Sequence, residues 1–198
     1  MPRAAARDHA EKRAALRKGA AAYFAAEGYD RASVADVARH CGVSKGLIYH
    51  YYSGKEELLG DIIESHLAKL REGLRGGPDD AEARLRWLTA RILATYDGAD
   101  AEHQLQINNL SVVPEESQGR IRAIQREIVS EVATTLCALR PALVGDEARA
   151  RAVAMSLFGM VNWAYLWRRD GRDLSRSDYA DMVSDMVLGG LERILGNE

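Results

Sequence analysis

The hydrophobic positions of this 198-residue chain recur at intervals of three and four residues, which is the period of amphipathic α-helices. Leu16, Ala20 and Phe24 mark one face of a predicted helix over residues 8–27, and Gly28 stands where a left-handed C-cap belongs. No stretch shows the alternation of a half-buried strand. The pattern therefore predicts an all-α protein.

Two short helices follow, separated by a glycine turn. Ser33 and Asp36 have the spacing of an N-cap and its capping-box partner at the start of the first short helix, and Gly42 ends that helix. Ser44 is placed to cap the second, which is expected to run to about Tyr51. The three N-terminal helices together predict a small head.

Longer amphipathic helices fill the remainder of the chain. The fourth helix is expected to open at Ser53, with Glu56 as its capping-box partner. The later ones are expected at about 80–97, 101–111, 115–139, 146–170 and 176–195. About nine helices result, divided into a head over residues 1–55 and a larger helical body over residues 56–198.

The charges are distributed unevenly between these two parts. Residues 1–55 carry ten Lys and Arg against five Asp and Glu, whereas residues 56–198 carry 17 against 24. The net charge of −2 disfavours a general binder of polyanions. A basic head on an acidic body fits a protein of which only one end meets DNA.

The cysteines and the lengths of the apolar runs also indicate the cellular compartment of the protein. Cys41 and Cys137 form no paired motif, which fits a reducing cytoplasm. The longest uncharged run, residues 152–167, is shorter than the roughly 20 residues that span a bilayer. Charges that include Arg3 and Arg7 interrupt any apolar signal core, so we expect no export signal. A cytoplasmic protein without membrane contact is predicted.

Residues 33–52 have the organisation of a helix-turn-helix. Gly42 permits the positive φ of a turn, and Ser44 caps the helix that follows. A helix that enters a major groove needs short or polar exposed side chains and a buried back. Ile48 and Tyr52 supply the buried anchor, and the outward positions are Lys45, Gly46, Leu47 and Tyr49.

The run Gly-Val-Ser-Lys-Gly-Leu-Ile-Tyr-His-Tyr-Tyr-Ser-Gly-Lys-Glu-Glu-Leu at residues 42–58, preceded by Phe24 and Gly28-Tyr29, resembles the signature of the TetR family of repressors. The resemblance covers roughly residues 10–60. It implies an all-helical protein with three helices for DNA and about six for dimerisation and ligand binding. One departure is Gly54, where the family often has Asn or Ser, and it is expected to shift the helix cap back to Ser53.

The resemblance also implies roles for individual residues. Lys45, Gly46 and Tyr49 would approach base edges, and Leu47 a thymine methyl group. Phosphates would be contacted by Ser33, His50, Tyr51 and Lys55. The predicted DNA-binding set is Ser33, Ser44, Lys45, Gly46, Leu47, Tyr49, His50, Tyr51 and Lys55.

A second, shorter resemblance bears on the ligand. Residues 157–167, followed by Arg-Arg-Asp-Gly at 168–171, are similar to the eighth helix of TetR-type regulators that respond to acyl-CoA thioesters. An acyl-CoA inducer is therefore the hypothesis, with a hydrophobic drug or aromatic metabolite as the alternative. Apolar residues with a few polar ones make the candidate pocket: Ile62, His66, Leu70, Leu88, Ile92, Tyr96, Leu105, Asn108, Asn109, Phe158, Asn162, Trp163 and Trp167.

The last predicted helix carries an apolar stripe of Tyr179, Met182, Val183, Met186, Val187, Leu191 and Ile194. Such a stripe would suit a helical scaffolding protein. In the family resemblance it implies a homodimer formed through the last two helices. A dimer would also double one short recognition helix to read a palindromic operator, as a repressor that an inducer releases.

Two further alternatives come from isolated residues. Gly42, Ser44 and Gly46 satisfy G-x-S-x-G, but a hydrolase elbow must follow a strand, and the preceding segment has helical period. A metal sensor would have to use His9, His40, His50, His66, His103, Cys41 and Cys137, which lack the short spacings of a zinc site. The sequence therefore predicts no enzyme activity, no cofactor and no metal.

Overall fold

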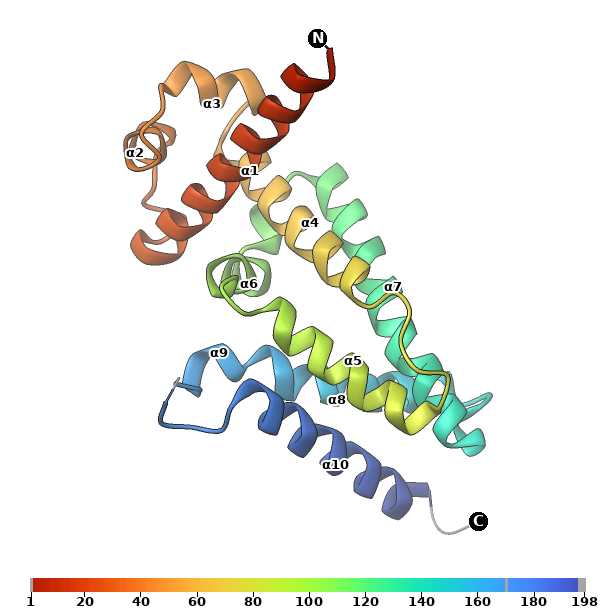
Figure 1. The fold of residues 1–198 in the computed structure, drawn as a ribbon. Helices are drawn as coiled ribbons and strands as arrows, with labels where there is room; N and C mark the ends of the chain where they lie inside the picture. The colour runs from red at the N-terminus through yellow and green to blue at the C-terminus, as the bar shows by residue number, and fades with distance from the viewer. Residues whose placement is uncertain (1, 170, 196–198) are drawn as a thin grey trace. The chain divides into compact units, whose positions relative to one another are not determined.

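The computed structural model describes residues 2–169 and 171–195, and every regular element in these ranges is a helix (Figure 1). The elements are α1 (Pro2–Glu27), α2 (Val34–His40), α3 (Lys45–Tyr51), α4 (Lys55–Gly73), α5 (Ala81–Thr95), α6 (Asp100–Asn108), η1 (Leu110–Val112), α7 (Glu115–Leu139), η2 (Pro141–Leu143), α8 (Glu147–Asn162), α9 (Ala164–Trp167) and α10 (Arg176–Leu195). The predicted all-α class is confirmed. Residues 1, 170 and 196–198 lie outside the described residues, so predicted ranges that include them are compared with the structure only over their other residues.

The nine expected helices correspond to α1–α8 and α10, with three differences. The helix expected over 101–111 ends at Asn108, and the 3-10 turn η1 follows it. Helix α1 begins at Pro2 rather than near residue 8, because proline is tolerated in a first turn and the alanines that follow favour helix. The helix expected over 146–170 divides at Trp163, where α8 ends and the four-residue α9 follows. Neither proline nor glycine marks that break.

The chain divides into two compact units, which are described separately. One unit contains residues 1–68 and 99–122, and the other contains residues 69–98 and 123–198. Helices α4 and α7 each contribute residues to both. The functional division at residue 55 stays a prediction. Among the described helices, none combines the length and the apolar character needed to cross a membrane.

In the first unit, α1 packs against α2 and α6. Leu16, Ala20 and Phe24 are buried as their spacing predicts, and Gly28 has the positive φ (87°) expected of a left-handed cap. Ile48 of α3 is completely buried. The burial of these side chains fixes the three N-terminal helices as one packed head.

Helices α1 and α2 approach each other closely at Gly19. A Cβ atom built on this glycine would lie 2.7 Å from the Cys41 Sγ but at an ordinary 3.7 Å from the Cys41 Cβ. Burial raises the pKa of the Cys41 thiol, which keeps it protonated and unreactive. Cys41 is therefore a packing residue against α1.

We expect Gly19→Ala to lower the free energy of unfolding by about 1 kcal/mol, because overpacking outweighs the better helix propensity of alanine. In a Cys41→Ala background the thiol is gone, and the same change should instead raise stability by about 1 kcal/mol. Urea unfolding of the four proteins measures this change of sign. The same effect of Gly19→Ala in both backgrounds would contradict the assigned contact.

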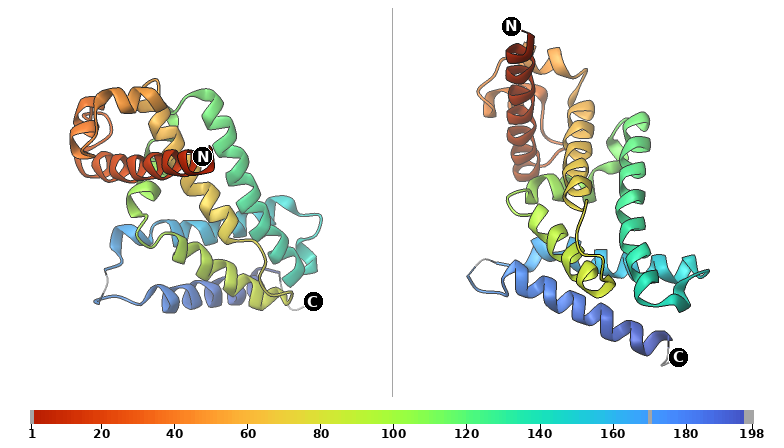
Figure 2. Two further views of the ribbon diagram at one scale, coloured as in Figure 1. Left: turned by 45° about the horizontal axis from the view of Figure 1, so that its top comes forward. Right: turned by 45° about the vertical axis from the view of Figure 1, so that its right-hand side comes forward.

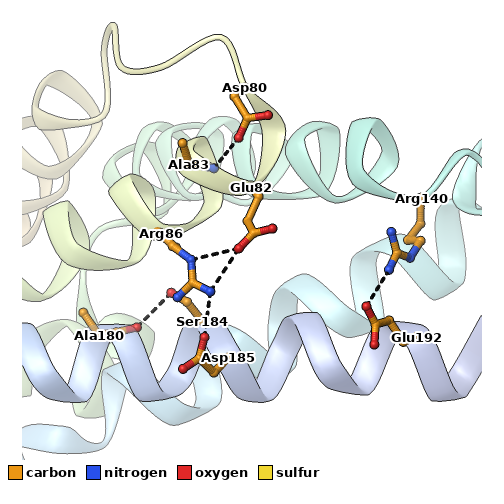
Figure 3. Close-up of polar contacts among 9 residues, drawn as sticks. All are labelled: Asp80, Glu82, Ala83, Arg86, Arg140, Ala180, Ser184, Asp185 and Glu192. Atoms are coloured by element: carbon orange, nitrogen blue, oxygen red, sulfur yellow. Dashed lines mark hydrogen bonds and ion pairs between the residues drawn. The ribbon is translucent and has the colours of Figure 1, made fainter.

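In the second unit, α10 packs along α5 and also contacts α8 (Figures 1 and 2). Polar contacts fix its position: Arg86 of α5 reaches both Glu82 of its own helix and Asp185 of α10, and Arg140 pairs with Glu192 (Figure 3). The Tyr179 hydroxyl donates to the Met160 carbonyl at 2.9 Å. Helix α10 is therefore held in a defined rotation.

This rotation divides the apolar stripe of α10 into two faces. Tyr179, Val183, Val187 and Leu191 are buried within the unit, whereas Met182, Met186 and Ile194 are 40%, 57% and 61% exposed. On α8, Met155 is also 50% exposed. The predicted stripe is thus only partly occupied by this chain's own core.

Candidate nucleic-acid interface

Helix α2 starts with a complete capping box. The Ser33 hydroxyl accepts a hydrogen bond from the Asp36 backbone N–H at 3.2 Å, and the Ser33 backbone N–H donates to the Asp36 carboxylate at 3.2 Å. The Ser33 hydroxyl, and then its backbone N–H, hold the pKa of Asp36 below its ordinary value. These two hydrogen bonds confirm the predicted cap, and Ser33 is exposed at this helix end.

The turn before α3 is built as its residues predict. Gly42 adopts a φ of 66°, and the Ser44 hydroxyl accepts from the Leu47 backbone N–H at 3.1 Å. Ser44 therefore caps α3, and the segment before it is helix α2 rather than a strand. This geometry does not fit a hydrolase elbow.

Helix α3 presents its polar side to solvent over a buried back. Lys45, Gly46 and His50 are exposed, Tyr49 is 49% exposed, and Leu47 and Tyr51 are half-buried. The Lys45 ammonium lies over the Tyr49 ring, with Nζ 5.5 Å from the ring centroid. This cation–π contact orders the two long side chains together.

The C-terminal end of α3 is fixed by a cluster around Asp61 of α4. The Asp61 carboxylate accepts from the Tyr52 hydroxyl at 2.6 Å, from Arg13 Nε at 3.0 Å and from Arg17 at 3.1 Å. Burial, followed by the bond to Asp61, raises the pKa of Tyr52 to about 12. This cluster, absent from the predicted site, joins α1, α3 and α4.

The start of α4 differs from the prediction. The capping partner of Ser53 is Glu57 and not Glu56: the Ser53 backbone N–H and hydroxyl donate to the Glu57 carboxylate at 2.7 and 2.9 Å. These bonds lower the pKa of Glu57. The helix begins at Lys55 with Gly54 ahead of it, so Ser53 stands one residue too early for the expected box.

Lys55, predicted to contact phosphate, is turned toward the protein. Its ammonium donates to the carbonyls of Tyr29, Asp30 and Ala32 at 3.1, 3.3 and 3.1 Å, and it lies 4.5 Å from the centroid of the Tyr29 ring. An ammonium has three N–H donors, and three carbonyls occupy them. Lys55 thereby ties α4 to the segment between α1 and α2.

We therefore expect Lys55→Met to lower the free energy of unfolding by about 1–3 kcal/mol, because three carbonyls lose a charged donor while the aliphatic stem remains. The salt dependence of DNA binding should change little. Urea unfolding and binding titrations at several salt concentrations separate the two roles. Unchanged stability together with a shallower salt dependence would show that Lys55 contacts phosphate, as the sequence predicted.

The ligand residues predicted in the first unit divide by exposure. Ile62, His66 and Leu105 are buried, Asn109 is half-buried and Asn108 is exposed. The His66 ring lies 5.8 Å from that of His103, which is also buried. Within the described residues, no three His, Cys, Asp or Glu side chains converge as metal ligands.

In the second unit, two of the predicted polar residues meet. The Tyr96 hydroxyl donates to Asn162 Oδ1 at 2.7 Å, and burial raises the pKa of Tyr96. The predicted residues Leu70, Leu88, Ile92 and Phe158 are buried. Trp163 and Trp167 differ from this core, being 49% and 45% exposed, with the Trp167 ring centroid 5.1 Å from that of Tyr179.

A cavity of about 290 Å³ in this unit has a different lining. Its walls are Arg71, Leu74, Arg75, Gly76, Arg84, Glu127, Ile128 and Glu131. Two of its arginines form ion pairs with two of its carboxylates, Arg71 with Glu127 and Arg84 with Glu131. None of the predicted ligand residues lines this cavity.

Two protein families match the chain. The family described as bacterial regulatory proteins, tetR family, matches residues 16–62, which include the capped helices and the start of α4. The family described as tetracyclin repressor-like, C-terminal domain, matches residues 78–191. The second match alone extends over more than half of the chain.

Individual proteins are similar along nearly the whole length. The transcriptional activator FasR of Mycolicibacterium smegmatis is 24% identical over 188 residues, which cover 93% of this chain and 84% of FasR. The crystal structure of a TetR-family transcriptional regulator from Bordetella parapertussis is 30% identical, with a TM-score of 0.83 over 93% of this chain and 98% of that one.

A third similar protein was crystallised with ligands. The structure of AibR in complex with isovaleryl coenzyme A and operator DNA has a TM-score of 0.76 and 21% identity, covering 88% of this chain and 96% of that one. At this identity the likeness shows a shared fold.

Proposed function

The chain belongs to the TetR family of bacterial regulatory proteins, and from this premise we propose that a homodimer of it represses transcription by binding a palindromic operator until a small molecule releases it. The family consists of DNA-binding transcriptional regulators rather than enzymes. The operator, the dimer, the direction of regulation and the inducer are the parts that we propose.

The observation that carries the proposal is the exposed side of α3, whose opposite side is buried and whose end is held by the hydrogen bonds of Asp61. Lys45, Gly46 and Tyr49 stand at the N-terminal end and on the solvent side of this helix, where a recognition helix meets base edges. Ser33 and His50 are exposed nearby as phosphate contacts. Because Ile48 is completely buried, this surface is presented rigidly.

The exposed apolar residues of α8 and α10 support a dimer through these helices. Met155, Met182 and Met186 leave large apolar surfaces uncovered in the single chain. Beyond the backbone of its own helix and its chain neighbours, a Cβ atom added at Gly159 or Gly189 would meet no described atom within 4 Å, which leaves room for a close partner. A second copy covers these surfaces in the proposal.

We place the inducer in the second unit, near the Tyr96–Asn162 pair. Buried apolar side chains with one polar pair describe the usual lining of a small-molecule site. The acyl-CoA hypothesis is supported by the isovaleryl coenzyme A bound to AibR. The exposed Arg169 is a candidate for its phosphates. A hydrophobic drug or an aromatic metabolite is the alternative class.

Release requires a difference in affinity between two states. An inducer that binds the DNA-competent and DNA-incompetent arrangements equally shifts nothing. Helix α4 is continuous from Lys55 to Gly73 and contributes to both units. It is therefore the element through which a ligand in the body changes the head.

We propose repression because a bound dimer excludes polymerase from an overlapping promoter with no further contact, whereas activation needs a specific contact with the polymerase. An operator-binding protein must also share the compartment of the chromosome, so the proposed location is the cytoplasm.

The test is a selection of bound duplexes from a random DNA pool, repeated with isovaleryl-CoA and longer acyl-CoAs present. We expect a palindromic sequence to be enriched without ligand and lost with an acyl-CoA. Transcription from a promoter that carries this sequence should fall when the protein is added. Matched and scrambled duplexes of equal length control for charge-driven binding.

Each part of the proposal can fail separately. Enrichment without any symmetry would contradict the dimer on a palindrome. Enrichment that no acyl-CoA reduces would overturn the acyl-CoA hypothesis, and a panel of aromatic and drug-like compounds would then test the alternative. Increased transcription would overturn repression.

A further inference from the structure

Three rings from two helices gather at the exposed end of the head. The His9 ring of α1 lies 4.7 Å from the Tyr51 ring of α3 and 6.0 Å from the His50 ring, between centroids. The rings of His50 and Tyr51 are 5.2 Å apart. We call His9, His50 and Tyr51 the ring cluster.

The ring cluster is a surface feature rather than a part of the core. His9 and His50 are exposed and Tyr51 is half-buried. The cluster follows directly on the exposed face of α3 that carries Tyr49. In the proposed function, exposed side chains beside the recognition helix lie within reach of the DNA backbone.

The charged neighbours of the ring cluster are largely paired with one another. On α1, Lys12 Nζ lies 2.7 Å from the Asp8 carboxylate. The bond to Asp8, followed by Coulombic attraction to it and to Tyr51, raises the pKa of Lys12. Arg13 is engaged by Asp61 and by Tyr52, whose hydroxyl stays protonated at neutral pH.

Imidazole is the side chain that changes charge between about pH 5 and 8. Lys12 and Arg13 on α1 remain cationic and the phenol of Tyr52, the C-cap of α3, remains neutral between pH 6 and 8, because the pKa of each is raised. Within the ring cluster, the imidazoles of His9 and His50 are the side chains that a bound phosphate can protonate near neutral pH. A phosphate is the ligand that favours their protonated form.

We propose that His9 is a further DNA-contact residue, and that His9 and His50 together form a phosphate-binding corner that takes up protons when DNA binds. This inference rests on the proposed function. A phosphodiester beside an imidazolium stabilises the protonated state in the complex relative to the free protein. DNA affinity is then greatest at low pH and falls as the pH rises through the range in which the bound imidazoles lose their protons.

The experiment measures affinity for the selected duplex between pH 6 and 8 at constant salt. We expect the wild type to take up at least one proton per dimer, which weakens binding about tenfold for each pH unit. His9→Gln should reduce this pH dependence by about half and weaken binding at pH 6 more than at pH 8. His9→Arg carries a permanent charge and should retain strong binding at pH 8.

The matched control is His40→Gln. His40 is also exposed in the head, but its ring lies against Tyr23, 5.1 Å between centroids, outside the ring cluster. The pH dependence of this variant should equal that of the wild type. Circular dichroism of each variant confirms that the head is folded.

The outcomes separate this inference from the proposed function. Absence of any duplex binding by the wild type contradicts the proposed function. Specific binding whose pH dependence is the same in His9→Gln and in the wild type overturns the role of His9 and leaves the proposed function intact. If His40→Gln abolished the pH dependence of DNA affinity, the proton uptake would belong to His40 and not to the ring cluster.

Discussion

Replacing Asp61 by alanine is expected to lower the free energy of unfolding by about 2–3 kcal/mol. The Asp61 side chain is 18% exposed and accepts bonds from Arg13, Arg17 and Tyr52. Its removal leaves two adjacent guanidinium groups without a counter-charge and a nearly buried hydroxyl without its acceptor. Breaking a buried ion pair costs about 3–5 kcal/mol, and the partial exposure of the arginines reduces this value.

Urea unfolding followed by circular dichroism measures the loss. The control is Glu11→Ala, which removes the exposed ion pair with Arg7 on the same helix α1 and should leave stability unchanged. Because the cluster fixes the end of α3, Asp61→Ala should also weaken DNA binding for all sequences alike. Equal stability of the two variants would contradict the role of the cluster.

The second large effect is expected on sequence preference. Tyr49→Ala and Lys45→Ala should each weaken binding to the selected operator by about 1 kcal/mol at each half-site, or about thirtyfold for a dimer. The loss should be smaller on scrambled duplexes, because base contacts contribute little there. The Lys45 ammonium over the Tyr49 ring makes the two effects less than additive.

Tyr49→Phe separates the ring from the hydroxyl. It keeps the cation–π partner of Lys45, so any loss of affinity reports the hydroxyl contact alone. Competition binding with matched, single-base-substituted and scrambled duplexes is the measurement. Identical losses on every duplex would show that Lys45 and Tyr49 contact the backbone and do not read bases.

The sequence predicted the parts of the head that depend on neighbouring residues. The caps at Ser33 and Ser44 and the positive φ of Gly42 follow from spacings of a few residues, and all are present. The buried positions Phe24 and Ile48 follow from helical period. Such features are local, so a pattern specifies them.

The features that the sequence did not predict depend on distant residues. Asp61 meets Arg13 at a separation of 48 residues, and Lys55 meets the Tyr29 carbonyl at a separation of 26. The His9 contact with Tyr51 also joins two helices. These pairs meet only because their helices pack together, and the spacing of residues along the sequence does not predict such contacts.

The body was predicted less well for a related reason. An apolar stripe gives the same pattern whether its own chain or a second copy covers it, so the sequence did not separate the buried Val183 from the exposed Met186. In the same way, the apolar lining of a pocket and the interior of a packed core have the same sequence pattern. The predicted ligand residues therefore remain a proposal, with the Tyr96–Asn162 bond as the contact between two of them.

The most direct test is the number of chains bound to one operator duplex, measured by sedimentation equilibrium at saturation. The account predicts two chains on a palindrome whose half-site centres lie about one helical turn, or roughly 34 Å, apart. It also predicts much weaker binding when that separation is changed by half a turn. A single chain per duplex, or equal affinity at every separation, would contradict it.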